Sequence, residues 1–283
     1  MPHASGQGQL FIVATPIGNL GDMVPRAVET LQTVDVIAAE DTRHSSRLLS
    51  HFEIKTPMVA YHDHNDGQRT AQLIERLQSG QRVALISDAG TPLISDPGYR
   101  LVAEARAAGV VVIPIPGACA LIAALSASGL PTDRFQFEGF LPAKQVARQK
   151  VLRSLADSTA TMLFYEAPHR IVDSLQDIEQ VLGGQRRVVL ARELSKTFET
   201  FIDGAVAEVL SQVTADSNQQ RGEMVLMVAG VEPVKRDIDP AAQQLMQLLM
   251  SHLPLKKAAA IVAEHCGLKK NQLYQWGLDQ NDR

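Results

Sequence analysis

The sequence predicts two successive α/β domains followed by a small helical appendage. From Leu10 onward, five short apolar runs alternate with amphipathic helical segments, a pattern typical of a mostly parallel, doubly wound sheet. Beyond Gly129 the apolar runs have fewer helices between them, which indicates a mixed sheet. A polar, proline-bearing connector and three short amphipathic segments follow. We therefore expect α/β domains at residues 9–129 and 130–232 and a helical domain at residues 238–283.

The elements of the first domain are placed from their apolar pattern. We expect strands at residues 10–14, 34–38, 58–61, 83–86 and 110–115. We expect helices at residues 25–33, 42–51, 70–79 and 99–108. Gly80 and Gly109 follow two of these helices, as glycines that end helices do. In such a sheet, ligands bind at the carboxyl edge of the strands.

The second domain and the appendage are divided in the same way. In the second domain we expect strands at residues 135–140, 161–165, 187–191, 197–202 and 223–228, and helices at residues 146–155, 171–182 and 205–212. In the appendage we expect helices at residues 241–252, 255–265 and 269–277. The last two are separated by a short turn, as in a helix-turn-helix.

The composition limits the classes of protein to which the chain can belong. The chain has 283 residues, 45% of them hydrophobic and 20% charged, which is typical of a soluble globular protein. Its net charge of −4 argues against a protein that coats nucleic acid by bulk charge, but allows a local basic patch. The first eight residues form no secretory signal, and no apolar run is long enough for a membrane span. Two distant cysteines, Cys119 and Cys266, favour the reducing cytoplasm over a disulfide scaffold.

The segment SDAGTPLISDPG at residues 87–98 is the most informative motif. It follows an apolar strand and is too rich in turn-forming residues to be core. Gly90 and Pro92 turn the backbone sharply and present Asp88 and Thr91 at the carboxyl edge of the sheet. We therefore expect this segment to bind a ligand.

Two other strand ends of the first domain are weaker candidates. The loop at residues 15–22 would let backbone amides approach a ligand, although a plain strand-to-helix turn is the simpler explanation. Residues 39–44, AEDTRH, bring two carboxylates and a guanidinium to the same edge. Helix capping by Asp41 or Thr42 explains them equally well. The residues around His62 and His64 lack further ligands at a recognisable spacing, so we expect no metal site.

The second domain has two similar strand ends. FYEAPHR at residues 164–170 delivers four polar groups just before a helix, which favours a role facing a cleft. RELSK at residues 192–196 ends a neighbouring strand, where a salt-bridged surface loop is also possible. In the appendage, lysines cluster at both ends of the turn. A solvated helix face is the common reason for such charges, and the turn geometry only slightly favours contacts with phosphates.

Six motifs in order and spacing carry a resemblance to a known family: TPIGNLGD (15–22), AEDTR (39–43), SDAGTPLISDPG (87–98), PG (116–117), EGFLP (138–142) and FYEAPHR (164–170). Together they closely resemble the ribosomal RNA small-subunit methyltransferase I family of the tetrapyrrole methylase superfamily. The resemblance extends through KKAAAIVAEHCGLKKNQLY (256–274) and so covers nearly the whole chain.

The resemblance implies a fold, a reaction and partners. It implies two α/β domains with S-adenosylmethionine bound in the cleft between them, usually in a homodimer. The implied reaction is methylation of the ribose 2′-hydroxyl of a cytidine in the decoding region of 16S ribosomal RNA, on the RNA or the small subunit. A methyltransferase of a small macrocycle, such as a corrinoid precursor, is the alternative within the superfamily. A noncatalytic RNA-binding or ribosome assembly factor that only binds S-adenosylmethionine is the alternative outside it.

The resemblance also implies site residues. The positions that match cofactor contacts are Pro16, Ile17, Asp88, Ala89, Gly90, Thr91, Pro92, Ile94, Cys119, Ala120 and Tyr165. The family usually has a serine where this chain has Cys119, so a side-chain hydrogen bond there is lost while backbone contacts remain.

A ribose hydroxyl is a poor nucleophile while protonated, so a general base would assist the transfer. We expect Glu166 or His169 to be this base, and Glu40 after them. We expect the RNA phosphates to contact Arg43, Arg170, Lys196, Lys256, Lys257, Lys269 and Lys270.

Overall fold

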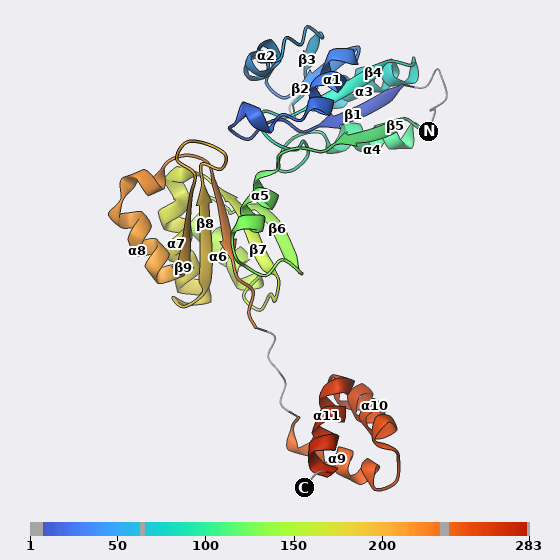
Figure 1. The fold of residues 1–283 in the computed structure, drawn as a ribbon, viewed down its shortest axis with the longest axis vertical. Helices are drawn as coiled ribbons and strands as arrows, with labels where there is room; N and C mark the ends of the chain where they lie inside the picture. Colours follow the sequence, from blue (N-terminus) through green and yellow to red (C-terminus); the bar gives the residue numbers. More distant parts are fainter. Residues whose placement is uncertain (1–7, 63–65, 233–237, 282–283) are drawn as a thin grey trace. The chain divides into compact units, whose positions relative to one another are not determined.

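The computed structural model describes residues 8–62, 66–232 and 238–281, which belong to two compact units, residues 1–231 and 232–283. The first unit contains two β-sheets with their helices, and the second contains three helices (Figure 1). Parts of the predicted histidine-bearing loop and of the polar connector, residues 63–65 and 233–237, lie outside the described residues, as does most of the amino-terminal octapeptide. No helix in the described ranges combines the length and apolarity needed to cross a membrane.

The first sheet is parallel, as predicted, with the strand order β3-β2-β4-β1-β5. Its strands are β1 (Gln9–Val13), β2 (Val36–Ala39), β3 (Met58–Ala60), β4 (Arg82–Ile86) and β5 (Val111–Ile115). Its helices are α1 (Pro25–Thr33), α2 (Thr42–His51), α3 (Asp66–Gln78) and α4 (Tyr99–Ala107). Alternate residues of β4 enter two cores. Ala84 and Ile86 pack with residues of α1 and α2, whereas Val83 and Leu85 pack with residues of α3 and α4. The doubly wound arrangement is therefore confirmed.

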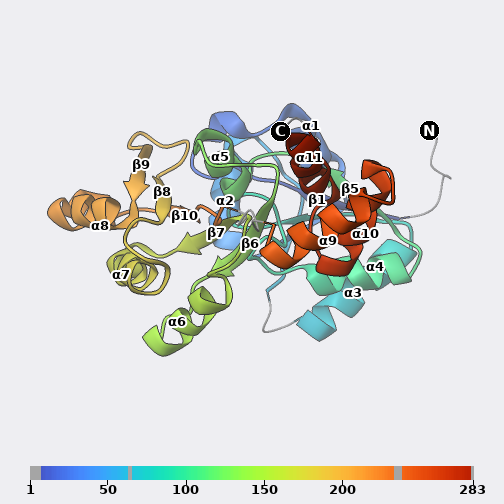
Figure 2. The same cartoon turned by 90° about the horizontal axis from the view of Figure 1, so that it is seen from below.

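The second sheet is mixed, as predicted, with the strand order β6-β7-β10-β8-β9. Its strands are β6 (Phe135–Phe140), β7 (Thr161–Glu166), β8 (Arg187–Arg192), β9 (Thr200–Ala205) and β10 (Met224–Val228). Only β6 and β7 pair in parallel, and the other neighbours are antiparallel. One face carries α6 (Gln145–Ser154), α7 (Ile171–Leu182) and α8 (Val206–Ala215). The other carries α5 (Ala120–Ala127), as Figure 2 shows.

The core beneath α5 also joins the two sheets. Leu121 and Leu125 of α5 pack on β7, β8 and β10, and Ile17 and Ile94 from loops of the first sheet pack against the same cluster. Strand-end loops of the first sheet are thereby held against the second sheet. This junction positions the candidate site.

The helical unit has a core of its own. It consists of α9 (Pro240–Met250), α10 (Leu255–Cys266) and α11 (Lys270–Asn281). Met246, Ala259, Val262 and Leu273 meet in its buried interior. Gly267, in the left-handed conformation with φ of 64°, ends α10 and permits the short turn before α11.

Candidate active site

A pocket of about 370 Å³ lies at the junction of the two sheets. The loops after β1, β2 and β4 form one side, and the start of α5, the end of β7 and the start of β10 form another. It contains nine of the eleven positions predicted to contact the cofactor: Ile17, Asp88, Ala89, Gly90, Thr91, Ile94, Cys119, Ala120 and Tyr165. Of the remaining two, Pro16 lines an adjacent cavity, and Pro92 is buried.

The backbone of the SDAGTP segment is held by two reciprocal main-chain hydrogen bonds with the loop after β1. The amide of Thr15 donates to the carbonyl of Gly90 at 2.8 Å, and the amide of Gly90 donates back at 3.1 Å. Gly90 has a φ of +82°, and a Cβ there would lie 3.1 Å from Cγ2 of Ile17. The Thr91 hydroxyl donates to the carbonyl of Ala118 at 2.9 Å. The turn is therefore tied both to the loop after β1 and to the loop before α5.

Two pocket carboxylates are fixed by main-chain amides. The amide of Asp88 donates to Glu40 at 3.4 Å, and the amide of Asp41 donates to Asp88 at 3.1 Å. Asp41 itself caps α2, because its carboxylate accepts from the amides of Arg43 and His44. The hydrogen bond from the Arg43 amide lowers the pKa of Asp41. Each of the two explanations of the AEDTRH motif thus applies to a different residue: Asp41 caps a helix, and Glu40 lines the pocket.

Tyr165 connects the end of β7 to α5. Its hydroxyl oxygen accepts a hydrogen bond from the amide of Leu121 at 3.3 Å, and its ring meets the edges of Phe137 and Phe140. Burial, reinforced by the neighbouring Cys119 thiol, raises the pKa of Tyr165 well above its usual range. Tyr165 therefore remains a neutral, apolar wall of the pocket.

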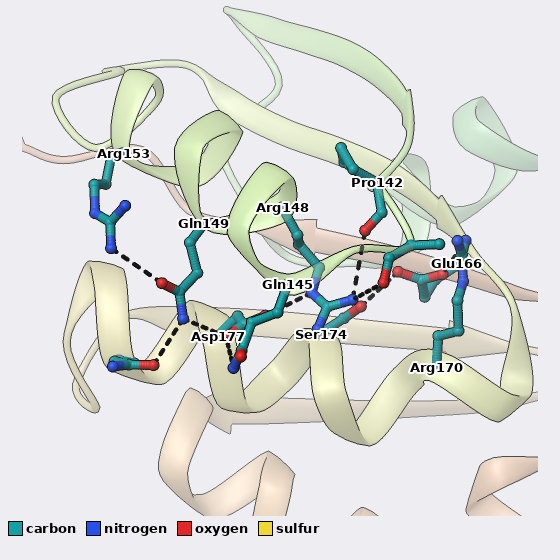
Figure 3. A network of polar contacts seen from close by, with 11 residues as sticks. Pro142, Gln145, Arg148, Gln149, Arg153, Glu166, Arg170, Ser174 and Asp177 are labelled. Atoms are coloured by element: carbon teal, nitrogen blue, oxygen red, sulfur yellow. Dashed lines mark hydrogen bonds and ion pairs between the residues drawn. The ribbon is translucent and has the colours of Figure 1, made fainter.

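Glu166 is fully engaged by its own domain (Figure 3). Its buried carboxylate pairs with Arg170 at 2.6 Å, accepts from the Ser174 hydroxyl at 2.6 Å and accepts from the amide of Ala167 at 2.8 Å. His169 is exposed and does not line the pocket. This geometry favours Glu166 and Arg170 as residues that shape the end of β7. Their predicted roles toward the base and the phosphates stay predictions.

A second buried ion pair joins α7 to α6 (Figure 3). Asp177 on α7 pairs with Arg148 on α6 at 2.6 Å, and their side chains are 1% and 4% exposed. Burial would raise the pKa of Asp177, but hydrogen bonds from Gln149, Gln145 and Arg148 hold it below its ordinary value. Arg148 also donates to the carbonyl of Ala143 at 3.2 Å. The network fixes α7, and with it the helix face that holds Glu166.

We expect Arg148→Met to lower the free energy of unfolding by about 3–5 kcal/mol, because it leaves Asp177 buried without a cation. Urea denaturation measures this change. Arg153→Met is the matched control on the same helix, since Arg153 is exposed and donates to Gln149 at the surface. It should change stability by no more than about 0.5 kcal/mol. Equal losses of stability in the two variants would show that the buried Arg148–Asp177 pair stabilises the protein no more than the surface contact of Arg153 does.

The remaining predicted cations lie in three different settings. Lys196 pairs with Glu223 at 2.8 Å and Glu193 at 3.0 Å, and these carboxylates raise its pKa although burial alone would lower it. Its aliphatic chain packs against Gly18, so it links the second sheet to the first strand-end loop. The side chain of Arg43 is 92% exposed and pairs loosely with Asp41. The four predicted lysines of the helical unit, Lys256, Lys257, Lys269 and Lys270, are all exposed.

The structure also brings residues to the pocket that the sequence did not single out. These are Ser95, Asp96, Phe140, Ala167, Pro168, Leu194, Glu223, Met224 and Val225. Ser95 and Asp96 belong to the quoted SDAGTPLISDPG motif, whose second turn, Asp-Pro-Gly at residues 96–98, was the available signal, and Phe140, Ala167, Pro168 and Leu194 also lie within quoted motifs. Among the described residues, no three histidine, cysteine, aspartate or glutamate side chains gather as a metal site requires.

Comparison with known proteins gives matches to two family models. Tetrapyrrole (Corrin/Porphyrin) Methylases matches residues 9–210, and RsmI C-terminal HTH domain matches residues 236–281. The Ribosomal RNA small subunit methyltransferase I of Pseudomonas aeruginosa is 56% identical, over 98% of this chain and 99% of that protein. Proteins of the same name from Vibrio cholerae and Escherichia coli O157:H7 are 55% and 54% identical, over 97% and 98% of this chain and 96% of each relative.

Solved structures share the fold at lower identity. The cobalt precorrin-4 methyltransferase CbiF gives a TM-score of 0.58 at 16% identity, over 80% of this chain and 97% of that one. The uroporphyrin-III-C-methyltransferase from Thermus thermophilus gives 0.56 at 19% identity, over 79% and 94%. At these identities the likeness concerns the fold alone.

Proposed function

The chain belongs to the tetrapyrrole methylase family and, within it, to the ribosomal RNA small subunit methyltransferase I proteins, and from this membership we propose its reaction. It transfers a methyl group from S-adenosylmethionine to the 2′-hydroxyl of a cytidine ribose in the decoding region of 16S ribosomal RNA. The observation that carries this proposal is the identity of 54–56% to relatives of that name, over nearly the full length. The matched length includes both the pocket motifs and the helical unit.

The pocket suits S-adenosylmethionine, which supplies an electrophilic methyl group on a sulfonium. Ile17, Ile94 and Tyr165 would provide apolar walls for the cofactor, and the backbone at Gly90 would allow its close approach. A volume of about 370 Å³ falls in the range of small-molecule sites. The residues that would hold the cofactor are the nine predicted positions that line this pocket.

Methyl transfer also requires removal of the proton from the acceptor hydroxyl. Of the three predicted bases, Glu40 lines the pocket and accepts a hydrogen bond from the amide of Asp88, whereas Glu166 pairs with Arg170 and His169 is exposed outside the pocket lining. The geometry therefore favours Glu40 as the group that receives the proton. The chain's main contribution is to hold the acceptor oxygen close to the methyl carbon in a cleft that excludes water.

The RNA would be bound outside the pocket. The exposed Lys256, Lys257, Lys269 and Lys270 of the helical unit, together with Arg43 in the first turn of α2, are the cations best placed for phosphates. A macrocycle methyltransferase would have no use for a helical unit with four exposed lysines, so this alternative is disfavoured. We further propose that the chain works in the cytoplasm as a homodimer, which light scattering would test.

The decisive experiment incubates the protein with labelled S-adenosylmethionine and small ribosomal subunits from an undermethylated strain. The position of any 2′-O-methyl group is then mapped on the RNA. We expect one labelled cytidine in the decoding region. Binding of S-adenosylmethionine without labelling of either free RNA or subunits would instead support the noncatalytic alternative.

A further inference from the structure

The charged side chains that line the pocket are all carboxylates. They belong to Glu40, Asp88, Asp96, Glu166 and Glu223, and within the described residues no lysine, arginine or histidine lines the same pocket. Such a pocket attracts a cation and repels the phosphates of RNA. How strongly each carboxylate would attract a cationic ligand depends on the partners that the protein gives it.

Two of the five are neutralised by cations that lie outside the pocket lining. Arg170 pairs with Glu166 at 2.6 Å, and Lys196 pairs with Glu223 at 2.8 Å. Two more are held by main-chain amides: the amide of Asp88 donates to Glu40, and the amide of Asp41 donates to Asp88. Glu166 and Glu223 are therefore paired with cations, whereas Glu40 and Asp88 are oriented by amides and keep their negative charge.

Asp96 is in a different position. It is half-buried, and no ion pair among the described residues neutralises it. Burial raises its pKa, nearby Asp88 raises it further, and a hydrogen bond with Ser87 only partly opposes this. The protein alone thus makes the negative charge of Asp96 unfavourable, and a cation in the pocket would relieve this.

The backbone beside Asp96 is also unusual. Leu93 and Ser95 have φ angles of +73° and +65°, in the left-handed region that side-chain-bearing residues seldom adopt. Each such residue costs on the order of 1 kcal/mol or more, and this strain tends to persist at functional sites. The loop therefore holds Asp96 at the pocket at an energetic cost.

We propose that Asp96 is a specificity-determining residue that makes the pocket prefer the cationic sulfonium cofactor over the neutral thioether left after methyl transfer. The inference rests on the proposal that this pocket holds S-adenosylmethionine. The cofactor and the thioether product, S-adenosylhomocysteine, differ by one methyl group and one positive charge. An unneutralised carboxylate binds the first more tightly than the second. The same interaction weakens once the charge is lost, which favours release of the product.

The test measures binding of both molecules, without RNA, by titration calorimetry. For Asp96→Asn we expect the preference for S-adenosylmethionine over S-adenosylhomocysteine to fall about tenfold, the scale of one charge pair several ångströms apart at a partly exposed site. The fall should come from weaker binding of the cation. An analogue with a protonated amine in place of the sulfonium should follow S-adenosylmethionine, since charge and not the methyl group is recognised.

Two further variants make the result specific. Asp96→Glu keeps the charge and should keep most of the preference, and thermal melting shows whether each variant is folded. Glu75→Gln removes one exposed charge of α3 outside the pocket and should leave both affinities unchanged. An unchanged preference in folded Asp96→Asn, or equal weakening of both ligands, would overturn the inference. Failure of the wild type to bind either ligand would instead contradict the proposed cofactor site.

Discussion

Reversal of the four exposed lysines of the helical unit should abolish methylation of small subunits at physiological salt while leaving the cofactor site intact. Lys256 and Lys257 lie in the first turn of α10, and Lys269 and Lys270 flank the start of α11. If each contacts a phosphate, the slope of log affinity against log salt should become shallower by about three. Affinity for the RNA should fall on the order of a hundredfold or more. Filter binding at several salt concentrations measures both quantities.

The matched control reverses four exposed cations of the other unit, Lys55, Arg106, Lys144 and Lys150. Both variants then have the same net charge, so a difference between them reports position rather than bulk repulsion. Calorimetry should give unchanged S-adenosylmethionine affinity for the lysine variant, because the pocket is built entirely from the first unit. Equal losses of RNA affinity in the two variants would show that the helical unit has no privileged part in binding.

Much of the fold could be predicted from sequence because apolar runs and turn residues are local signals. The starts of β2 and β9 differ from the predicted ones, and the reason is again local. Val34 was expected to begin a strand, but its amide donates to Thr30 and closes α1, so β2 starts at Val36. β9 was expected from Thr197 but begins at Thr200, because Glu199 is used in a turn with Ser195 and Lys196.

The site was harder to predict because its electrostatics depend on pairs that are distant in sequence. Lys196 meets Glu223 only because β8 and β10 are neighbours in the sheet, and no local pattern reveals that order. Glu166 resembled a reactive carboxylate in its motif, yet Arg170 and Ser174, four and eight residues further along the chain, engage it. Asp96 reaches the pocket through left-handed residues that sequence rules disfavour. Motif residues could thus be located, but their charge states required the tertiary structure.

The second large effect is expected at the glycine that turns the SDAGTP segment. Gly90→Ala should weaken S-adenosylmethionine binding by roughly tenfold or more, because the turn that lines the pocket has to shift to make room for the added Cβ. The new Cβ would lie 3.1 Å from Ile17, so either this pocket wall or the turn must shift. Calorimetry with S-adenosylmethionine measures the loss.

Gly109→Ala separates the cost of a left-handed alanine from the cost of packing its Cβ against Ile17. Gly109 has a similar φ of +76°, but a Cβ there meets nothing within 4 Å. Both variants should therefore lose about 1 kcal/mol of stability from the backbone conformation, as urea denaturation would show. Only Gly90→Ala should also lose cofactor affinity, because only Gly90 is pressed against a residue that lines the pocket. If Gly90→Ala binds S-adenosylmethionine as tightly as Gly109→Ala does, the close packing of this turn is not needed to form the cofactor site.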